Sequence, residues 1–330
     1  MAVSISDITK LRKLTGAGLA DCKKALEATE GDIEKAIEVI REKGQAVAAK
    51  RSDREASEGC VITKAENGFG AIIALKCETD FVANNADFVK LAQSILDLAV
   101  ANKCKTLDEV KALKLGDVTV EQAIVDRSGI TGEKMELDGY MTIEGDNISV
   151  YNHQNKNTLC TMVNLSKAVP AEYGHGVAMQ VAAMNPVALN EDSVPQDVKD
   201  NEYKIAVQKT KEEQVEKAVQ NALKKAGFNL YIAENEEHLA EGIQKKMITE
   251  EQADEIRKIK KETAEQKAAN LPEQMIQNIA NGRMNKFYKE SCLLNQDYIM
   301  DSSKTVAAFL KEADKDCTVT DFKRFTLRSE

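Results

Sequence analysis

The residues best suited to nucleophilic or metal chemistry are seven cysteines and three histidines. The cysteines are odd in number, scattered and never spaced as Cys-x-x-Cys, a pattern that favours free, buried thiols in a reducing compartment. The histidines lie in separate segments, and none is near Cys77, so we expect neither a metal centre nor a thiol enzyme. Phosphate-loop and Ser-elbow motifs are also missing from the sequence, and we expect no cofactor and no covalent chemistry. These residues are Cys22, Cys60, Cys77, Cys104, Cys160, Cys292 and Cys317, with His153, His175 and His238.

A second group of residues suits binding rather than catalysis. Residues 71–75 form an apolar run typical of a buried strand, and the apolar positions of residues 86–92 recur at helical spacing. Thr79 and Asp80 therefore lie at a strand-to-helix junction, where either side chain can cap the helix. Phe81 follows them directly. It either folds under into the core or stands out as a wedge for another molecule.

Composition indicates which kinds of molecule this chain could bind. With 330 residues the chain can form two or three small domains, and 43% hydrophobic residues, no Trp and only 4 Pro favour ordered, helix-rich structure. No apolar run has membrane-spanning length, and the first five residues lack a basic region followed by an apolar one, so we expect a cytoplasmic protein that binds no membrane. A net charge of −9 argues against direct nucleic-acid binding. A protein partner is the better expectation.

The N-terminal part of the chain predicts a small helical module. Residues 5–43 carry three short amphipathic helical patterns, broken at Gly16 and Gly18 and again before Asp32, which is placed to cap the third helix. We interpret residues 1–43 as a three-helix module of the ubiquitin-associated type. Residues 44–57 read as a linker with some helical content, and we expect its basic run of Lys50, Arg51 and Arg54 to be solvated.

The middle of the chain suggests a duplication. Two strand-turn-strand-helix patterns begin at Glu58 and Glu144, about 86 residues apart, the first with Asn67 and Gly68 as its hairpin turn. They predict an α+β core with one half at residues 58–140 and the other at residues 141–186 and 272–330. The predicted strands are 58–63, 69–75, 144–151 and 158–165, and the predicted helices are 88–100 and 172–184. Between the halves, residues 107–126 read as helix and residues 127–137 as irregular.

Residues 187–271 predict an inserted antiparallel helical hairpin of the coiled-coil type. Its two arms, residues 196–226 and 236–270, are rich in Lys, Glu, Gln and Ala with sparse apolar positions. We expect the charges to be solvated. A capping-box pattern at Thr249 and Gln252 indicates that the return arm is broken. After it, Pro272 suits the start of a new helix. The last predicted elements are a short strand at 298–300, a helix at 306–310 and a strand at 319–325.

Three segments resemble one known family. They are Cys-Glu-Thr-Asp-Phe-Val-Ala-Asn at residues 77–84, the stretch at residues 11–26 that contains Leu-Thr-Gly-Ala-Gly-Leu, and Gly-Arg-Met-Asn-Lys-Phe at residues 282–287 followed by residues 301–306. In this order they resemble the elongation factor Ts family, the guanine-nucleotide exchange factors of the translational GTPase elongation factor Tu. The resemblance implies that Thr79, Asp80, Phe81 and Val82 displace the Mg²⁺ of the partner, with Phe81 as a wedge.

The resemblance also implies further contacts with elongation factor Tu. Arg12, Leu19 and Ala20 would dock the N-terminal module, although Ala20 is small where the family often has a larger side chain. Either Ile130 or Thr131 would supply an exposed apolar contact, and His153 would lie near the partner surface. The chain stops soon after Phe325 without the further C-terminal helix of some members, so we expect no contact from such a helix. Oligomeric state and the role of the long hairpin stay open.

A non-catalytic adaptor is the alternative to an exchange factor. It would use the three-helix module and the coiled coil to join partners without changing their nucleotide. For an adaptor, replacement of Phe81 by Ala should destabilise the fold by about 3 to 5 kcal/mol if Phe81 lies in the core, and should have no effect if it does not. An exchange factor instead predicts intact folding and lost activity.

Overall fold

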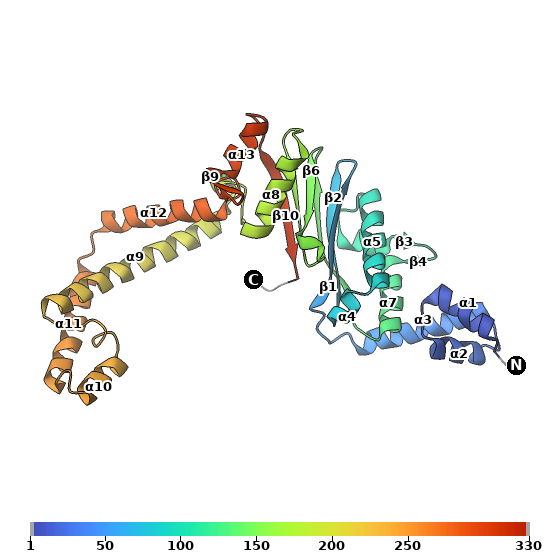
Figure 1. Ribbon diagram of the computed structural model, residues 1–330, viewed down its shortest axis with the longest axis horizontal. Coiled ribbons are helices and arrows are strands. Elements are labelled where there is room, and N and C mark those ends of the chain that lie inside the picture. The colour runs from blue at the N-terminus through green and yellow to red at the C-terminus, as the bar shows by residue number, and fades with distance from the viewer. Residues whose placement is uncertain (1–2, 328–330) are drawn as a thin grey trace. The chain divides into compact units, whose positions relative to one another are not determined.

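The computed structural model of this chain describes residues 3–327, and its fold is α+β, as the sequence predicts (Figure 1). Two compact units are present: Met1–Leu189 together with Gln296–Glu330, and Asn190–Asn295. Within the described residues, no helix combines the length and the apolar character needed to cross a membrane.

Three helices open the first unit: α1 (Ile5–Thr15), α2 (Leu19–Ala28) and α3 (Ile33–Lys50). They pack around a small core that includes the fully buried Leu11 and Leu26. The helical content expected in the linker at residues 44–57 lies in its first half, because α3 continues through Lys50. Ala-rich sequence after Gly44 favours helix, and Gly44 itself is buried where α3 crosses a later helix. As predicted, Asp32 caps α3 by accepting a hydrogen bond from the Lys35 N–H.

The first sheet contains β1 (Glu58–Glu66), β2 (Phe69–Cys77) and β5 (Met135–Glu144), in the antiparallel order β1-β2-β5. The hairpin turn lies at Asn67 and Gly68, as predicted, and both residues have positive φ, as a type I′ hairpin turn requires. The central strand β2 is buried along nearly its whole length.

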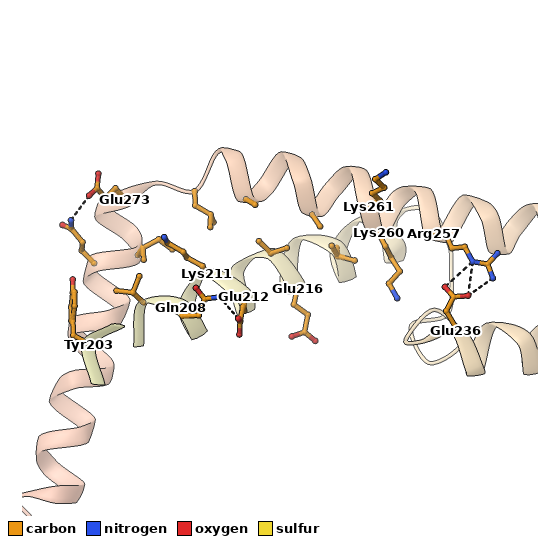
Figure 2. A pocket seen from close by; sticks show the side chains of 18 residues that line it. Tyr203, Gln208, Lys211, Glu212, Glu216, Glu236, Arg257, Lys260, Lys261 and Glu273 are labelled. Carbon is orange, nitrogen blue, oxygen red and sulfur yellow. Dashed lines mark hydrogen bonds and ion pairs between the residues drawn. The ribbon is translucent and has the colours of Figure 1, made fainter. Parts of the chain in front are cut away.

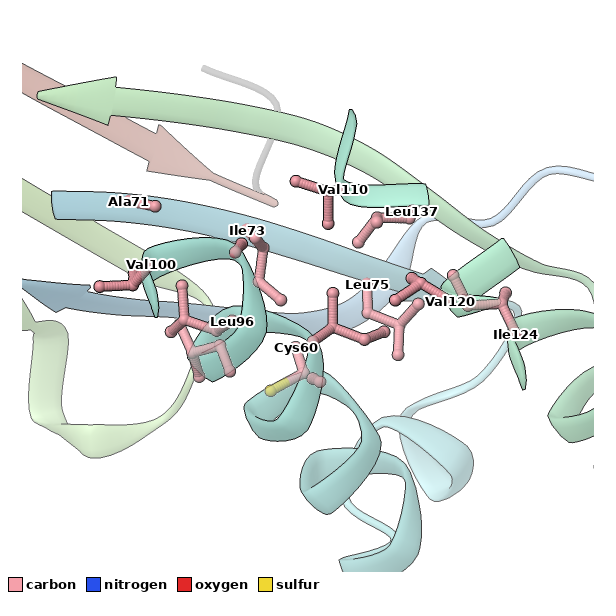
Figure 3. Packing of buried hydrophobic residues seen from close by; sticks show 14 of the residues in the cluster. Cys60, Ala71, Ile73, Leu75, Leu96, Val100, Val110, Val120, Ile124 and Leu137 are labelled. Atoms are coloured by element: carbon pink, nitrogen blue, oxygen red, sulfur yellow. The ribbon is translucent and has the colours of Figure 1, made fainter. Parts of the chain in front are cut away.

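One face of this sheet is covered by α5 (Ala86–Ala101), and Figure 3 shows the packing between them. Ile73 and Leu75 point into this layer with Leu96 of α5, while the alternate residue Ile72 points to the opposite face. The period-two pattern of β2 therefore serves two layers, which explains why the strand reads as a continuous apolar run.

The second sheet repeats this arrangement with β6 (Ile148–Asn152), β7 (Leu159–Leu165) and β10 (Val319–Thr326), in the order β10-β7-β6. In each sheet a hairpin is followed by a helix, here α8 (Ala171–Met184), and the third strand pairs with the second strand of the hairpin. The topology therefore has the same repeat as the sequence pattern. Buried side chains between the two sheets include Val61, Ile72, Ala74, Ile143, Cys160 and Met162.

The segment between the halves differs from its prediction. A two-stranded hairpin, β3 (Lys114–Leu115) and β4 (Val118–Thr119), turns at Gly116 with a φ of 67° and splits the predicted helix into α6 (Leu107–Ala112) and α7 (Val120–Thr131). Residues 127–137 are not irregular either, because α7 continues through Thr131 and β5 begins at Met135. The edge of β2 offers unpaired backbone groups, and β5 satisfies them by pairing with it.

The second unit contains three long helices, α9 (Gln196–Lys225), α11 (Glu250–Ala269) and α12 (Glu273–Ser291). It also contains the shorter α10 (Glu236–Gln244) and, before α9, the short η2 (Glu191–Ser193). The return along α9 is broken, and Thr249 and Gln252 form the predicted capping box at the start of α11. This unit has a core of its own, made of Leu223, Ile232, Ala233, Leu239, Ala253 and Ile256.

The helix α12 packs along α9, although residues 272–330 are predicted to belong to the second half of the core (Figure 1). Arg283 of α12 pairs with Glu213 of α9 at 2.7 Å, and its Nε donates to Thr210 Oγ1 at 3.1 Å. Ile276 and Ala280 are buried on the same helix. Apolar spacing along α12 predicts a buried face without naming the surface that covers it.

The chain returns to the first unit through β8 (Asp297–Tyr298), β9 (Asp301–Thr305) and α13 (Val306–Ala313). The predicted strand at 298–300 is wrong after its first residue, because Ile299 and Met300 form the exposed turn of this hairpin. Tyr298 anchors the hairpin by stacking on Phe309 of α13, with ring centroids 4.0 Å apart.

Candidate functional site

The strand-to-helix junction after β2 is a single helical turn, α4 (Asp80–Ala83). Thr79 is its N-cap, and the Thr79 hydroxyl accepts a hydrogen bond from the Val82 N–H at 3.4 Å. Of the two predicted capping residues, Thr79 therefore caps the turn, and Asp80 is its exposed first residue. This leaves the Asp80 carboxylate pointing into solvent, where another molecule can reach it.

Phe81 is 86% exposed, so it does not fold under into the core. Its neighbour Val82 is half-buried and packs against the core cluster of the first sheet, together with Ala83. The turn is thus held on the core by Val82 and presents Phe81 outward. An exposed aromatic ring on a short, capped turn is an arrangement suited to insertion between apolar side chains of a partner.

Two carboxylates hold the residues just before this turn. Glu133, between α7 and β5, accepts hydrogen bonds from the Glu78 N–H at 3.2 Å, the Thr79 N–H at 3.1 Å and the Thr79 hydroxyl at 2.6 Å. In the reverse direction, Glu78 accepts a hydrogen bond from the Lys134 N–H at 2.6 Å. Each carboxylate therefore binds the backbone of the segment that carries the other.

Glu78 also pairs with two arginines from the end of the α3 segment. Arg51 lies 3.0 Å and Arg54 lies 2.9 Å from its carboxylate oxygens, and only 13% of the Glu78 side chain is exposed. Burial alone would raise the pKa of Glu78, but the Lys134 N–H and the two arginines outweigh it and lower the pKa to about 2. Both arginines therefore pair with Glu78, although the sequence predicts only solvated linker charges; the Arg54 side chain is still 57% exposed.

Cys77 precedes these residues at the end of β2 and is fully buried. Burial, and after it the negative charge of Glu133, raises the pKa of this thiol to about 12. The thiol stays protonated near neutral pH, which makes it a poor nucleophile. Its Sγ donates a hydrogen bond to the Thr79 carbonyl at 3.2 Å, so Cys77 helps to shape the turn rather than to attack a substrate.

The predicted docking residues of the N-terminal module are all exposed. Arg12 lies on α1, and Leu19 and Ala20 form the first turn of α2. Leu19 is 55% exposed, and the nearby Leu14 is 60% exposed. The tight turn around Gly16, whose φ is 70°, joins the two helices at this end of the module. Exposed leucines beside a basic residue make this end a candidate contact surface.

Ile130 is not the freely exposed side chain that the resemblance implies. It is half-buried on α7 and lines a small cleft of about 90 Å³ together with Leu14 and Ile40 of the module. Its Cδ1 lies 3.5 Å from the position that a Cβ on Gly16 would occupy. Thr131 is also half-buried, and its hydroxyl donates to the Arg127 carbonyl at 3.2 Å.

His153 lies in the short η1 (His153–Asn155) that follows β6 and is half-buried. Its Nδ1 is 3.1 Å from the Tyr151 hydroxyl, and the Tyr151 ring also packs edge-on against His175. These contacts fix the imidazole at the end of the second sheet. The hydrogen bond and the ring contact of His153 are both with Tyr151, not with the Thr79–Val82 turn.

An open groove of about 1210 Å³ lies between α9, α11 and α12 in the second unit (Figure 2). Apolar side chains such as Val215 and Leu271 line it, and charged side chains form its rim. Arg257 on this rim pairs with Glu236 at 2.7 Å. Among residues 3–327, no group of His, Cys, Asp and Glu is arranged to hold a metal ion, in the groove or elsewhere.

Comparison with known proteins gives one consistent result. The family model described as Elongation factor TS matches residues 78–236 and 237–329. Elongation factor Ts of Bacteroides fragilis is 64% identical to this chain over 330 residues, and that of Bacteroides thetaiotaomicron is 61% identical over 330 residues. Elongation factor Ts of Porphyromonas gingivalis is 41% identical over 331 residues, and in all three cases 100% of both chains is covered. The chain therefore belongs to the elongation factor Ts family.

Proposed function

We propose that this chain binds elongation factor Tu in its GDP-bound form and releases the nucleotide by disturbing the Mg²⁺ site of that GTPase. Membership of the family implies a nucleotide exchange factor of translation elongation that acts on elongation factor Tu without covalent chemistry. The observation that carries the finer proposal is the 86% exposed Phe81 on a capped turn that ends a buried strand.

The mechanism rests on the strict geometry of Mg²⁺. This ion requires nearly octahedral oxygen ligands at short distances, so a small displacement of the residues that hold it weakens metal and nucleotide together. In our proposal Phe81 inserts between apolar side chains of the GTPase, and Asp80 hydrogen-bonds its backbone or a basic group. Thr79 caps the turn, and Val82 anchors it to the core. This chain itself needs no metal or cofactor for the step.

The N-terminal helices form a second contact in this proposal. They act as a ubiquitin-associated-like module that docks on the GTPase through Arg12, Leu19 and Ala20, while His153 lies near the partner from the second half of the core. The predicted domain limits and the coiled-coil character of the hairpin belong to the same proposal. We place the protein in the cytoplasm, where it meets neither a membrane nor nucleic acid directly.

Thermodynamic linkage sets what such a factor can do. If this chain lowers the affinity of elongation factor Tu for GDP by some factor, then GDP lowers the affinity for this chain by the same factor. The chain therefore speeds the approach to equilibrium without choosing between GDP and GTP. It is released again when a nucleotide binds.

An adaptor is the second candidate, and the groove of the second unit favours it. A lined cavity of about 1210 Å³ between helices is large enough to take side chains of another protein. This candidate predicts binding to elongation factor Tu, or to another partner, without faster nucleotide release.

The test is the release rate of a fluorescent GDP analogue from elongation factor Tu, measured with excess unlabelled GDP. Substoichiometric amounts of this chain should accelerate release over many turnovers. If the folded chain does not accelerate release at any concentration, the exchange proposal is wrong and the adaptor becomes the better account. A heat-denatured sample of the chain is the control for nonspecific effects.

A further inference from the structure

We propose that Glu133 is a positioning residue of the exchange site, whose carboxylate fixes the Thr79–Val82 turn and thereby holds Phe81 outward. This inference rests on the proposed function and deepens it. The hydrogen bonds that Glu133 accepts come from Glu78 and Thr79, so its effect on Phe81 passes through these two residues.

The position of Glu133 follows from the end of the sheet. The last residue pair between β2 and β5 is Cys77 with Met135, and beyond it the two strands separate. The N–H groups of Glu78 and Thr79 would then lose their acceptors in a half-buried place, which is unfavourable. The Glu133 carboxylate accepts both of them, at 3.2 and 3.1 Å, so it extends the ladder by one step with side-chain oxygens.

The third hydrogen bond of Glu133 reaches the cap itself. The Thr79 hydroxyl donates to Glu133 at 2.6 Å, and the Thr79 Oγ1 also accepts a hydrogen bond from the Val82 N–H. Donation to a carboxylate fixes the direction of this hydroxyl, so that its lone pairs face the helix. The cap and the carboxylate therefore form one chain of hydrogen bonds from the connection between α7 and β5 to α4.

Such a support is needed because α4 has only four residues. A single helical turn is unstable by itself, and an exposed phenylalanine gains by folding onto the nearest apolar surface. If the turn were free, binding would also have to order it, which lowers affinity. Glu133 removes this cost by ordering the turn before the partner arrives.

Two measurements test the inference on the full-length chain. In hydrogen-exchange mass spectrometry, Glu133→Ala should increase amide exchange in peptides covering residues 78–83 and leave β1 unchanged. In the GDP-release assay, it should reduce the stimulation by about tenfold, since hydrogen bonds to a charged acceptor are lost. Glu133→Gln should lose less stimulation than Glu133→Ala, because its side-chain oxygen can still accept from both N–H groups while the Thr79 hydroxyl loses its carboxylate acceptor.

Glu109→Ala is the matched control. Glu109 accepts two backbone N–H bonds, from Lys105 and Thr106, in the same half of the core but at the start of α6. This variant should lose stability without a specific loss of stimulation. If Glu133→Ala does not fold, Thr79→Val is the alternative variant, because it removes the shared hydroxyl. It should show the same increase in amide exchange and the same loss of stimulation.

A double-mutant cycle separates positioning from general damage. In a Phe81→Ala background, Glu133→Ala should cause no further loss of stimulation, because its effect passes through Phe81. The inference would be overturned by an equal loss of stimulation in both backgrounds, or by full stimulation by Glu133→Ala. The proposed function would still hold in either case, provided that wild type stimulates release. If wild type itself fails to stimulate release, the proposed function fails, and this role of Glu133 fails with it.

Discussion

Glu78 shows at the residue scale how a buried charge can stabilise a turn. Its carboxylate replaces a backbone carbonyl as the acceptor for the Lys134 N–H and also pairs with Arg51 and Arg54. With so many donors the charged form is favoured even though the side chain is largely buried. The segment that follows α3 is thereby tied to the residues that precede Phe81.

The low pKa of Glu78 makes stability depend on pH in a defined direction. The pKa is about 2 in the folded protein and 4.5 without these contacts, so the stabilisation is complete above about pH 4.5 and is lost as the pH falls toward 2. Glu78→Gln should therefore be less stable than wild type at pH 7, and the difference should shrink below pH 4.5. Urea unfolding at a series of pH values measures this. A difference that grows on acidification would contradict the assignment.

The turn itself could be predicted from the sequence, but its supports could not. Thr79 and Phe81 stand in a strand-to-helix pattern that predicts a cap, and that leaves Phe81 either in the core or exposed as a wedge. Glu133 lies 54 residues from Thr79 in the chain, and nothing in the local sequence marks it as an acceptor for that residue. Arg51 and Arg54 look like ordinary linker charges until the fold brings Glu78 to them. The only local sign of these supports is that acidic residues lie directly beside the ends of strands.

At the scale of elements, α3 and α7 cross with their backbones almost in contact. A Cβ on Gly129 of α7 would lie 2.2 Å from the Gly44 Cα of α3, a distance that real side chains do not reach. Arg41 and Asp126 approach to 3.8 Å beside this crossing. The two glycines therefore allow the N-terminal helices to rest on the first half of the core.

Gly129→Ala should force these helices apart. We expect a loss of about 1 to 3 kcal/mol in the free energy of unfolding, as for an overpacked core position, and faster amide exchange in residues 44–50. Gly282→Ala is the matched control, because Gly282 is an exposed helical glycine on α12 with nothing within 4 Å of a new Cβ. The free energy of unfolding of that variant should rise by about 0.5 to 1 kcal/mol. Equal stability of Gly129→Ala and wild type would rule out a tight crossing.

Helices and strands with a regular apolar period could be predicted well from the sequence. Strands that form only because they pair with a neighbouring strand could not. The strands β1 and β2 and the helix α5 follow directly from their patterns. In contrast, β5 carries apolar residues at alternate positions around Gly139, where a φ of 98° and a register irregularity between Ile73 and Leu75 of β2 interrupt the period. The two-residue strands β3 and β4 are too short to leave any period.

At the scale of the whole molecule, the duplicated pattern in the sequence corresponds to two sheets with the same strand order. The halves differ where it matters for function. After β2 the chain forms the turn that carries Phe81, whereas after β7 it continues through Ser166 and Lys167 without an aromatic residue. A duplicated fold thus keeps its core while only one copy carries the proposed exchange site.

The most direct test of this account compares wild type with Phe81→Ala in the release of a fluorescent GDP analogue from elongation factor Tu. Since Phe81 is 86% exposed, the free energy of unfolding of Phe81→Ala should lie within about 0.5 kcal/mol of the wild-type value. Tyr231→Ala, which removes a 62% exposed aromatic ring in the second unit, is the control and should keep its activity. We predict strong acceleration by wild type and Tyr231→Ala and little by Phe81→Ala. Equal acceleration by all three would contradict the account.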